Sequence, residues 1–162
     1  MDVATNECLA SPIGTLMVVT RPDALVAIRF GGSPSGDEPG DCPSALHRDV
    51  MARLRAYFDG DRHAIDAIAV EPAGTPFQRR AWLALRDIPP GSTVTYRALA
   101  ERIGRPAAVR AVGAANGANP IPVVLPCHRV VGSSGRLVGY GGGLDCKRWL
   151  LMHEGAARSP RW

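Results

Sequence analysis

The chain has 162 residues, of which 46% are hydrophobic and 21% charged, and its formal net charge is +4. This length allows one domain or two small ones with a real hydrophobic core. No run of 18 apolar residues predicts a membrane span, and the first residues lack the charged stretch and apolar block of a signal peptide. We therefore expect a soluble, cytoplasmic protein with no membrane partner.

The charge is divided unevenly along the chain. Residues 1–72 hold 6 Arg against 11 Asp and Glu, a net charge of −5, whereas residues 73–162 hold 13 Arg and Lys against 4 Asp and Glu, a net charge of +9. An acidic half joined to a basic half indicates nucleic acid bound by the basic half alone. Genome composition is the alternative explanation for the many arginines, since 18 of the 19 basic residues are Arg.

The four cysteines predict neither a disulfide framework nor a metal site. They have no CxxC spacing, and the four histidines form no spaced ligand cluster with them. The eight residues are Cys8, Cys42, Cys127, Cys146, His47, His63, His128 and His153. We therefore expect reduced thiols and no bound metal.

The first half predicts a small α/β unit with a structural role. Residues 14–32 predict two strands joined by a turn at Arg21-Pro22-Asp23, and the charged, turn-rich segment Ser33–Ser44 predicts a surface loop. Residues 64–72 predict a short strand. Residues 45–60 predict a helix with one apolar face, formed by Leu46, Val50, Leu54 and Tyr57.

The second half is predicted to be mainly helical. Thr75 as N-cap and Gln78 three residues later form the capping box of a first helix. Residues 95–104 and 106–117 predict two more short helices, with Pro106 at the first position of the second. Two short helices joined by a tight turn are typical of a helix-turn-helix.

The second helix of this pair carries one long side chain, Arg110, among small residues. The small residues are Ala107, Ala108, Ala111, Gly113, Ala114, Ala115 and Gly117. Such a helix either packs tightly in a core or lets its backbone approach DNA closely, with Arg110 as a single probe. Residues 129–140 then predict a hairpin, or wing, turning at Ser133-Ser134-Gly135, and residues 144–155 predict a closing helix.

The apolar run VVLPCHRVVG, residues 123–132, is interrupted by Cys127 and His128. Most buried cysteines are inert, but an adjacent imidazole can lower the pKa of a thiol and supply thiolate. Neighbouring residues on a strand point to opposite faces, so the pair can act together only if the backbone bends at Pro126 or a water relays the proton. Glu154 is a candidate to orient the imidazole.

The segment PCHRVVG, with NPIPVVLPCHRV before it and GYGGGLDCKRWLLMHEG after it, resembles the O6-alkylguanine-DNA alkyltransferases (methylated-DNA–protein-cysteine methyltransferases). The resemblance covers residues 75–156, with a looser match at SPIGTLMVVT and LVAIRF. It implies a DNA repair protein that flips an O6-alkylguanine out of double-stranded DNA and transfers the alkyl group to its own cysteine. The thioether is permanent, so the resemblance implies one reaction per molecule, and it implies no cofactor.

The resemblance also assigns roles within the expected catalytic site. It implies that Cys127 accepts the alkyl group, that His128 acts as its base through a water, and that Glu154 orients His128. It implies that Tyr96 donates a hydrogen bond to the N3 nitrogen of the leaving guanine. Asn119 is implied to tie the end of the helix-turn-helix to the active-site turn.

For DNA, the resemblance implies that Arg110 enters the base stack where the guanine was and that its helix lies in the minor groove. The expected DNA-contacting residues are Thr95, Tyr96, Arg110, Ala111, Gly113 and Ala114. The expected residues of the base pocket are Pro126, Val130, Tyr140, Gly141 and Gly142. Many relatives carry Ser at the position of Gly141, so only a backbone N–H of that loop is expected to reach the O6 oxygen here.

We predict an α/β (α+β) fold in two domains. Residues 1–72 form an N-terminal structural domain with a small antiparallel sheet, and residues 73–162 form a mainly helical, winged helix-turn-helix-like domain that binds DNA and holds the alkyl acceptor. We expect a monomer in solution that clusters cooperatively on DNA, at the nucleoid if the host is bacterial. Two other classes fit parts of the sequence: a winged-helix DNA-binding protein without transfer activity, and a cysteine hydrolase built on the same Cys-His-Glu trio.

Overall fold

The computed structural model describes residues 4–32, 43–157 and 162. The chain forms two compact units, Met1–Ala73 and Gly74–Trp162, each of which is described by itself. Most of the expected surface loop Ser33–Ser44, together with Cys42, lies outside the described residues. Of the helices in the described segments, none combines the length and the apolar character needed to cross a bilayer.

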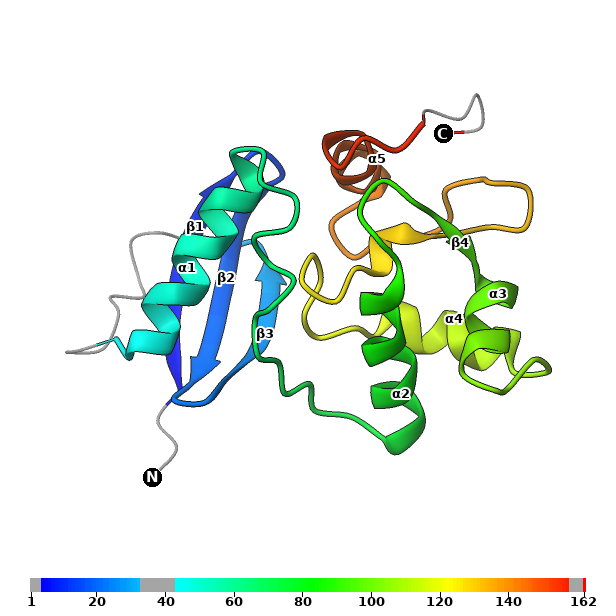
Figure 1. Cartoon of the computed structure of the whole chain (residues 1–162), viewed down its shortest axis with the longest axis horizontal. Coiled ribbons are helices and arrows are strands. Elements are labelled where there is room, and N and C mark those ends of the chain that lie inside the picture. Colours follow the sequence, from blue (N-terminus) through cyan, green and yellow to red (C-terminus); the bar gives the residue numbers. More distant parts are fainter. Residues whose placement is uncertain (1–3, 33–42, 158–161) are drawn as a thin grey trace. The chain divides into compact units, whose positions relative to one another are not determined.

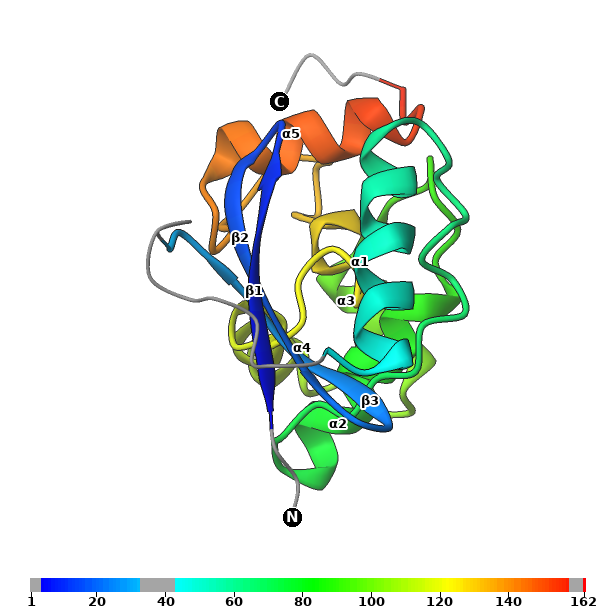
Figure 2. The same ribbon diagram turned by 90° about the vertical axis from the view of Figure 1, so that its left-hand side faces the viewer.

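A three-stranded antiparallel sheet and one helix make up the first unit (Figures 1 and 2). The strands β1 (Thr5–Ser11), β2 (Gly14–Arg21) and β3 (Ala24–Phe30) lie in the order β1-β2-β3. Helix α1 (Ala45–Phe58) contacts all three strands and buries His47, Val50, Met51, Leu54 and Tyr57. The two predicted strands and the helix are confirmed. Strand β1 was not predicted, because its sequence TNECLAS holds a single long aliphatic side chain.

The strand predicted over residues 64–72 is wrong. Residues 62–67 form turns, and Val70 makes only an isolated parallel bridge with Leu25. Ile65 and Ile68 are both buried, at 2% and 3% exposure. Their spacing of three places both side chains on the same side of a turn, so burial here comes from a turn rather than from a pleated strand.

The second unit is mainly helical, as expected. Its elements are α2 (Pro76–Ala84), η1 (Leu85–Asp87), β4 (Val94–Thr95), α3 (Tyr96–Arg102), α4 (Val109–Gly117), η2 (Cys127–Arg129), β5 (Val130–Val131) and α5 (Leu144–His153). The capping box of α2 is confirmed, since the Thr75 side chain accepts from the Gln78 N–H at 3.1 Å and the Gln78 side chain accepts from the Thr75 N–H at 3.0 Å. Helix α4 begins three residues later than predicted, because Ala108 N–H donates to Arg105 and closes a turn around Pro106.

The predicted wing does not form a hairpin. Strand β5 pairs in parallel with β4, through Val94 with Val130 and Thr95 with Val131. After β5 the chain turns back once, where the Gly132 N–H donates to the Arg136 carbonyl at 2.8 Å. No strand follows within residues 137–143 of the described chain. Gly139, at φ 58, leaves the extended conformation that a second strand would need.

Candidate active site

Three helices of the second unit form the scaffold of the site. Helices α3 and α4 pack together as the predicted helix-turn-helix, and α2 packs against α4 (Figure 1). The indole N–H of buried Trp82 on α2 donates to the Ala115 carbonyl on α4 at 2.6 Å. This hydrogen bond ties the Ala115 side of α4 to α2, while Arg110, Ala111 and Ala114 on the other side of α4 are exposed to solvent.

Cys127 follows a turn that Asn119 holds in place. The Asn119 side chain accepts from the Ile121 N–H at 3.0 Å and donates to the Leu125 carbonyl at 2.7 Å. Between these two contacts Val123 adopts φ 74, a strained backbone conformation for a β-branched residue. After this turn, Cys127 is the first residue of the short helix η2, and only 6% of the Cys127 surface is exposed.

The backbone bends at Pro126, which is one of the two ways in which the sequence allowed Cys127 and His128 to act together. Pro126 is the N-cap of η2, and its carbonyl accepts from the Arg129 N–H at 3.0 Å. In this tight helix, successive side chains no longer point to opposite faces as they do in a strand. The structure therefore removes the geometric objection to a joint role.

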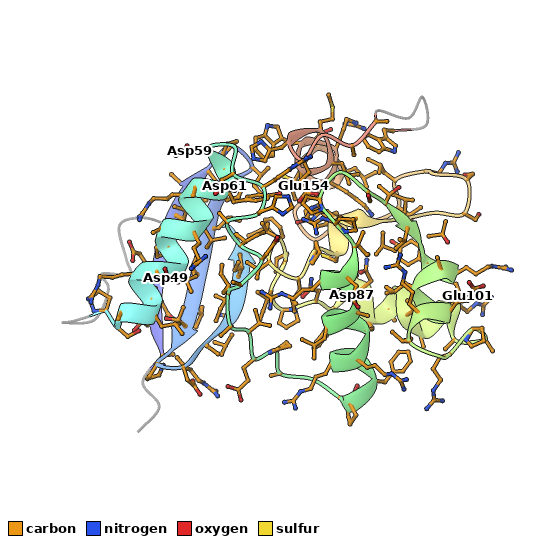
Figure 3. The ribbon with its side chains drawn as sticks, in the orientation of Figure 1. Asp49, Asp59, Asp61, Asp87, Glu101 and Glu154 are labelled. Atoms are coloured by element: carbon orange, nitrogen blue, oxygen red, sulfur yellow. The ribbon has the colours of Figure 1, made fainter. Side chains whose placement is uncertain are left out.

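His128 is completely buried and bonded to Glu154. Its Nε2 lies 2.7 Å from Oε1 of Glu154, the C-cap residue of α5. Glu154 is also fully buried, and Figure 3 shows it at the end of α5 among side chains that carry nitrogen. Because a carboxylate only accepts, Nε2 must carry the proton, and Nδ1 then has the lone pair. Nδ1 makes no hydrogen bond to the described residues, so it is available as a base.

Arg129 is a second buried partner of Glu154, which the sequence did not reveal. Its Nε donates to Oε2 at 2.9 Å and its Nη2 to Oε1 at 2.8 Å, while Nη1 donates to the Ile88 carbonyl at 2.6 Å. Burial alone would raise the pKa of Glu154, but the charges and hydrogen bonds of His128 and Arg129 lower it well below its ordinary value. The carboxylate thus stays ionised and can orient the imidazole.

The thiol is a weaker acid than the sequence suggested. Burial raises the pKa of Cys127, although a hydrogen bond to Asn119 and the charge of Lys147 oppose this. Burial also lowers the pKa of His128, against the opposing effect of Glu154. Both groups are therefore neutral at rest, a thiol beside an imidazole, rather than the preformed thiolate that adjacency to His128 seemed to offer. Forming a thiolate here therefore requires transfer of the thiol proton to a base.

Two further polar side chains, Tyr96 of α3 and Lys147 of α5, donate hydrogen bonds to the loop that precedes α5. The Tyr96 hydroxyl donates to the Val138 carbonyl at 3.0 Å, and Lys147 Nζ donates to the carbonyls of Val138 and Gly139, each at 3.2 Å. Burial lowers the pKa of Lys147 to about 8, while the charge of an ionised Cys127 would raise it. Lys147 is the only lysine of the chain, which was the one signal in the sequence that could have identified it.

The residues predicted for DNA lie around the helix-turn-helix. Arg110, Ala111 and Ala114 of α4 are exposed, while Gly113, Thr95 and Tyr96 are half-buried. The Thr95 side chain caps α3 by accepting from the Ala98 N–H at 3.1 Å, so it also has a structural role. Helix α4 is therefore neither wholly in the core nor wholly exposed: its small residues face both sides.

The residues predicted for the base pocket divide into buried and accessible ones. Pro126 and Val130 are buried, Tyr140 and Gly142 are half-buried, and Gly141 is exposed. The Tyr140 ring lies edge-on to the His128 ring, with the ring centroids 6.5 Å apart. No group of three or more His, Cys, Asp or Glu residues that could hold a metal occurs among the residues that the structure describes.

Fold and site together define a helix-turn-helix protein with a buried cysteine next to a buried His–Glu pair. Comparison with known proteins identifies the family. Residues 76–156 match the family model described as 6-O-methylguanine DNA methyltransferase, DNA binding domain. The chain belongs to this family, and the resemblance noted in the sequence is confirmed.

Named relatives and solved structures agree with this membership. A methylated-DNA–protein-cysteine methyltransferase of Mycolicibacterium paratuberculosis is 47% identical over 147 residues, which cover 89% of this chain and 88% of the relative. That of Shigella flexneri is 55% identical over 103 residues, which cover 64% of this chain but only 60% of the relative. A crystal structure of Mycobacterium tuberculosis OGT in complex with DNA superposes with a TM-score of 0.78 at 40% identity, covering 92% of this chain and 91% of that one. The mixed α/β fold is thereby confirmed.

Proposed function

We propose that this protein repairs DNA by transferring the alkyl group of O6-alkylguanine to the sulfur of Cys127, once per molecule and without a cofactor. Membership of the methyltransferase family supports the reaction class. The observation that carries the proposal for this chain is the buried array of Cys127 next to His128, with His128 bonded to Glu154 at 2.7 Å. This array sits on the same unit as the helix-turn-helix.

The proposed reaction is a direct displacement with two proton transfers. The Cys127 thiol gives its proton to Nδ1 of His128, through one water, and the sulfur attacks the alkyl carbon. The carbon–oxygen bond breaks and its electron pair goes to the guanine, which takes a proton from the Tyr96 hydroxyl. Because the guanine anion is a poor leaving group, this second transfer lowers the barrier. The imidazolium proton later returns to Tyr96 through solvent.

The burial of the site matches this sequence of events. A neutral thiol and a neutral imidazole avoid the cost of two charges in a buried site, and the ionised Glu154 stabilises the imidazolium only when it forms. The nearby Lys147 adds a positive charge that favours the thiolate. The carbon of the thioether product is a very poor electrophile, so the alkyl group stays on the sulfur and Cys127 is not regenerated.

We propose double-stranded DNA as the partner, bound through α4 in the minor groove. A base inside a duplex cannot reach a buried cysteine, so the guanine must be flipped out. The exposed small residues Ala111 and Ala114 allow close approach of the helix, and the exposed Arg110 fills the gap in the stack. We further propose that the protein acts as a monomer in the cytoplasm, at the nucleoid in a bacterial host, and clusters on DNA through neighbouring copies.

The test is the mass of the protein after incubation with a duplex that contains O6-methylguanine. We expect each molecule to gain one methyl group at Cys127, and repair to stop at one equivalent of DNA. Cys127→Ala should gain none yet keep its affinity for DNA, and the matched variants Cys8→Ser and Cys146→Ser should react like the wild type. An unmodified protein would favour a DNA-binding protein without transfer activity, and repeated turnover would favour a hydrolase.

A further inference from the structure

Trp162 contacts three segments of the second unit, although no role for it has been described so far. Its half-buried side chain packs against a small cluster of buried apolar side chains. The cluster consists of Val131, Leu137 and Leu151. The indole N–H donates to the Gly135 carbonyl at 3.2 Å, and the main-chain oxygen of Trp162 accepts from Nη2 of Arg148 at 3.2 Å. Trp162 therefore connects β5, the turn that follows β5, and helix α5.

The indole hydrogen bond is made to the turn that leads from β5 to Leu137. In this turn the Gly132 N–H donates to the Arg136 carbonyl at 2.8 Å, and the Gly135 N–H donates to the Gly132 carbonyl at 2.9 Å. The carbonyl of the same Gly135 accepts from the indole. Trp162 thus holds the turn itself and also covers the apolar side chains at both of its ends.

Two members of the cluster are close to groups of the proposed active site. Val131 pairs with Thr95, the residue directly before Tyr96. Leu151 lies on α5, three residues before Glu154 at the C-cap of that helix. A side chain that packs against this cluster therefore supports segments that carry reacting or orienting groups.

The third member, Leu137, begins the base-pocket loop, residues 137–143, which holds three of the residues expected to bind the guanine. The next residue, Val138, accepts at its carbonyl from the Tyr96 hydroxyl at 3.0 Å and from Nζ of buried Lys147 at 3.2 Å. Four of the seven residues of the loop are glycine, which loses more conformational entropy on ordering than any other residue. The loop therefore depends on contacts near its ends rather than on stiffness of its own.

We propose that Trp162 is a positioning residue for the base-pocket loop, because its ring supports the cluster at Leu137 and so holds the loop in the conformation that binds the alkylated guanine. This inference rests on the proposed function. The effect passes from Leu137 to Val138, whose carbonyl binds the Tyr96 hydroxyl. It concerns binding of the base more than the displacement at Cys127, which depends on the neighbouring histidine and its glutamate.

The first test is amide hydrogen exchange of the protein without substrate, which does not depend on alkyl transfer. In Trp162→Ala, residues 132–143 should exchange about tenfold faster, the effect of ~1.4 kcal/mol on local opening, while residues 76–84 of α2 exchange as in the wild type. Trp162→Phe keeps a ring over the cluster but lacks the N–H, so its exchange should be intermediate. Unchanged exchange of residues 132–143 in Trp162→Ala would overturn the proposal. Equally faster exchange in α2 would make Trp162 a general stabilising residue, and would overturn it too.

The second test is the reaction with O6-benzylguanine as a soluble base, at a temperature where every variant is folded. Trp162→Ala should raise the concentration that gives the half-maximal rate about tenfold, while the limiting rate stays within about threefold of the wild type. The matched control Leu83→Ala, at an exposed apolar position of α2, should change neither quantity. An unchanged half-maximal concentration in Trp162→Ala would contradict the proposal, whether or not the limiting rate falls. Failure of the proposed function looks different, because wild-type Cys127 would then gain no benzyl group.

Discussion

At the scale of single residues, Glu154 does two tasks that conflict with each other. It accepts a hydrogen bond from His128 at 2.7 Å, and it neutralises Arg129, whose guanidinium is buried with it. The charge of Arg129 makes the carboxylate less basic toward His128, but without Arg129 a carboxylate at this depth would take up a proton. The position of Glu154 at the C-cap of α5 lets both neighbours reach it.

The sequence identified part of this array and missed the rest. The trio Cys127, His128 and Glu154 could be predicted because thiol, imidazole and a scarce carboxylate have recognisable chemistry. The buried role of Arg129 could not, because one arginine among many reads as a surface charge. The raised pKa of Cys127 could not be predicted either, since adjacency to a histidine says nothing of burial.

The paired role of Glu154 predicts two separable effects of Glu154→Gln. The substitution should slow transfer by roughly 10- to 10³-fold, the range for lost acid–base assistance. It should also cost about 3–5 kcal/mol of stability, because it leaves buried Arg129 without a counter-charge. Rates with O6-benzylguanine and thermal unfolding measure the two effects. In Arg129→Met/Glu154→Gln most of the stability should return while transfer stays slow; if the rate returned as well, Glu154 would be purely structural.

The same residues predict that the protein is sensitive to acid. The pKa of His128 is lower in the folded protein than its ordinary value near 6.5, and that of Glu154 is lower than its ordinary value near 4.3. Below these ordinary values the unfolded chain takes up protons that the folded protein refuses, so stability is full at neutral pH and falls with pH. Unfolding temperatures measured from pH 7 to pH 4 should show this decline. His128→Phe should show a smaller decline between pH 7 and pH 5; an identical profile would contradict the assignment.

At the scale of helices and strands, the sequence correctly predicted the elements whose ends carry recognisable capping or turn residues. The start of α2 was clear because Thr75 and Gln78 cap each other, and the turn between α3 and α4 was clear from its glycine. The wing and the strand at 64–72 were wrong because apolar alternation is shared by strands and buried turns. What decides between them is a pairing partner elsewhere in the chain, which local sequence does not contain.

Packing of α2 gives a prediction at this scale. A Cβ on Gly74 would lie 2.5 Å from two atoms of the Trp82 ring, whose indole holds α4 through Ala115. Gly74→Ala should therefore destabilise the protein by about 1–3 kcal/mol, the cost of overpacking a tight site. Gly117→Ala is the matched control, since nothing lies within 4 Å of its added Cβ and alanine favours a helix. Equal unfolding temperatures for the two variants would show that the Trp82 ring moves freely.

At the scale of the whole molecule, acidic and basic residues are concentrated in different parts of the chain. The acidic residues 1–72 and the basic residues 73–162 nearly coincide with the two compact units. Within the second unit, the charged side chains of Arg129 and Lys147 are buried, while others such as Arg110 are exposed to solvent. Charge counted from sequence cannot tell these apart; burial does. DNA handling and chemistry should thus respond to different substitutions.

Arg110→Ala tests this separation. Extruding a guanine costs a few kcal/mol of stacking and pairing, and a side chain that fills the gap offsets part of it. A loss of about 1.5–3 kcal/mol should slow repair at saturating duplex by roughly 10- to 10²-fold. O6-benzylguanine as a soluble base needs no extrusion, so Arg110→Ala should react with it almost normally.

The contrasting variant is Tyr96→Phe, which should be slow with both substrates, because in the proposed reaction the Tyr96 hydroxyl assists the leaving base whether or not DNA is present.

If Arg110 only contacted a phosphate, its loss would weaken binding to damaged and undamaged DNA alike. It would also lower the salt dependence of binding by about one contact and leave the rate at saturating duplex unchanged. Equal slowing of Arg110→Ala with duplex and soluble base would place Arg110 in the chemistry or the fold. Since Arg110 is exposed on α4 whereas Cys127 is buried, we expect only the duplex reaction to slow.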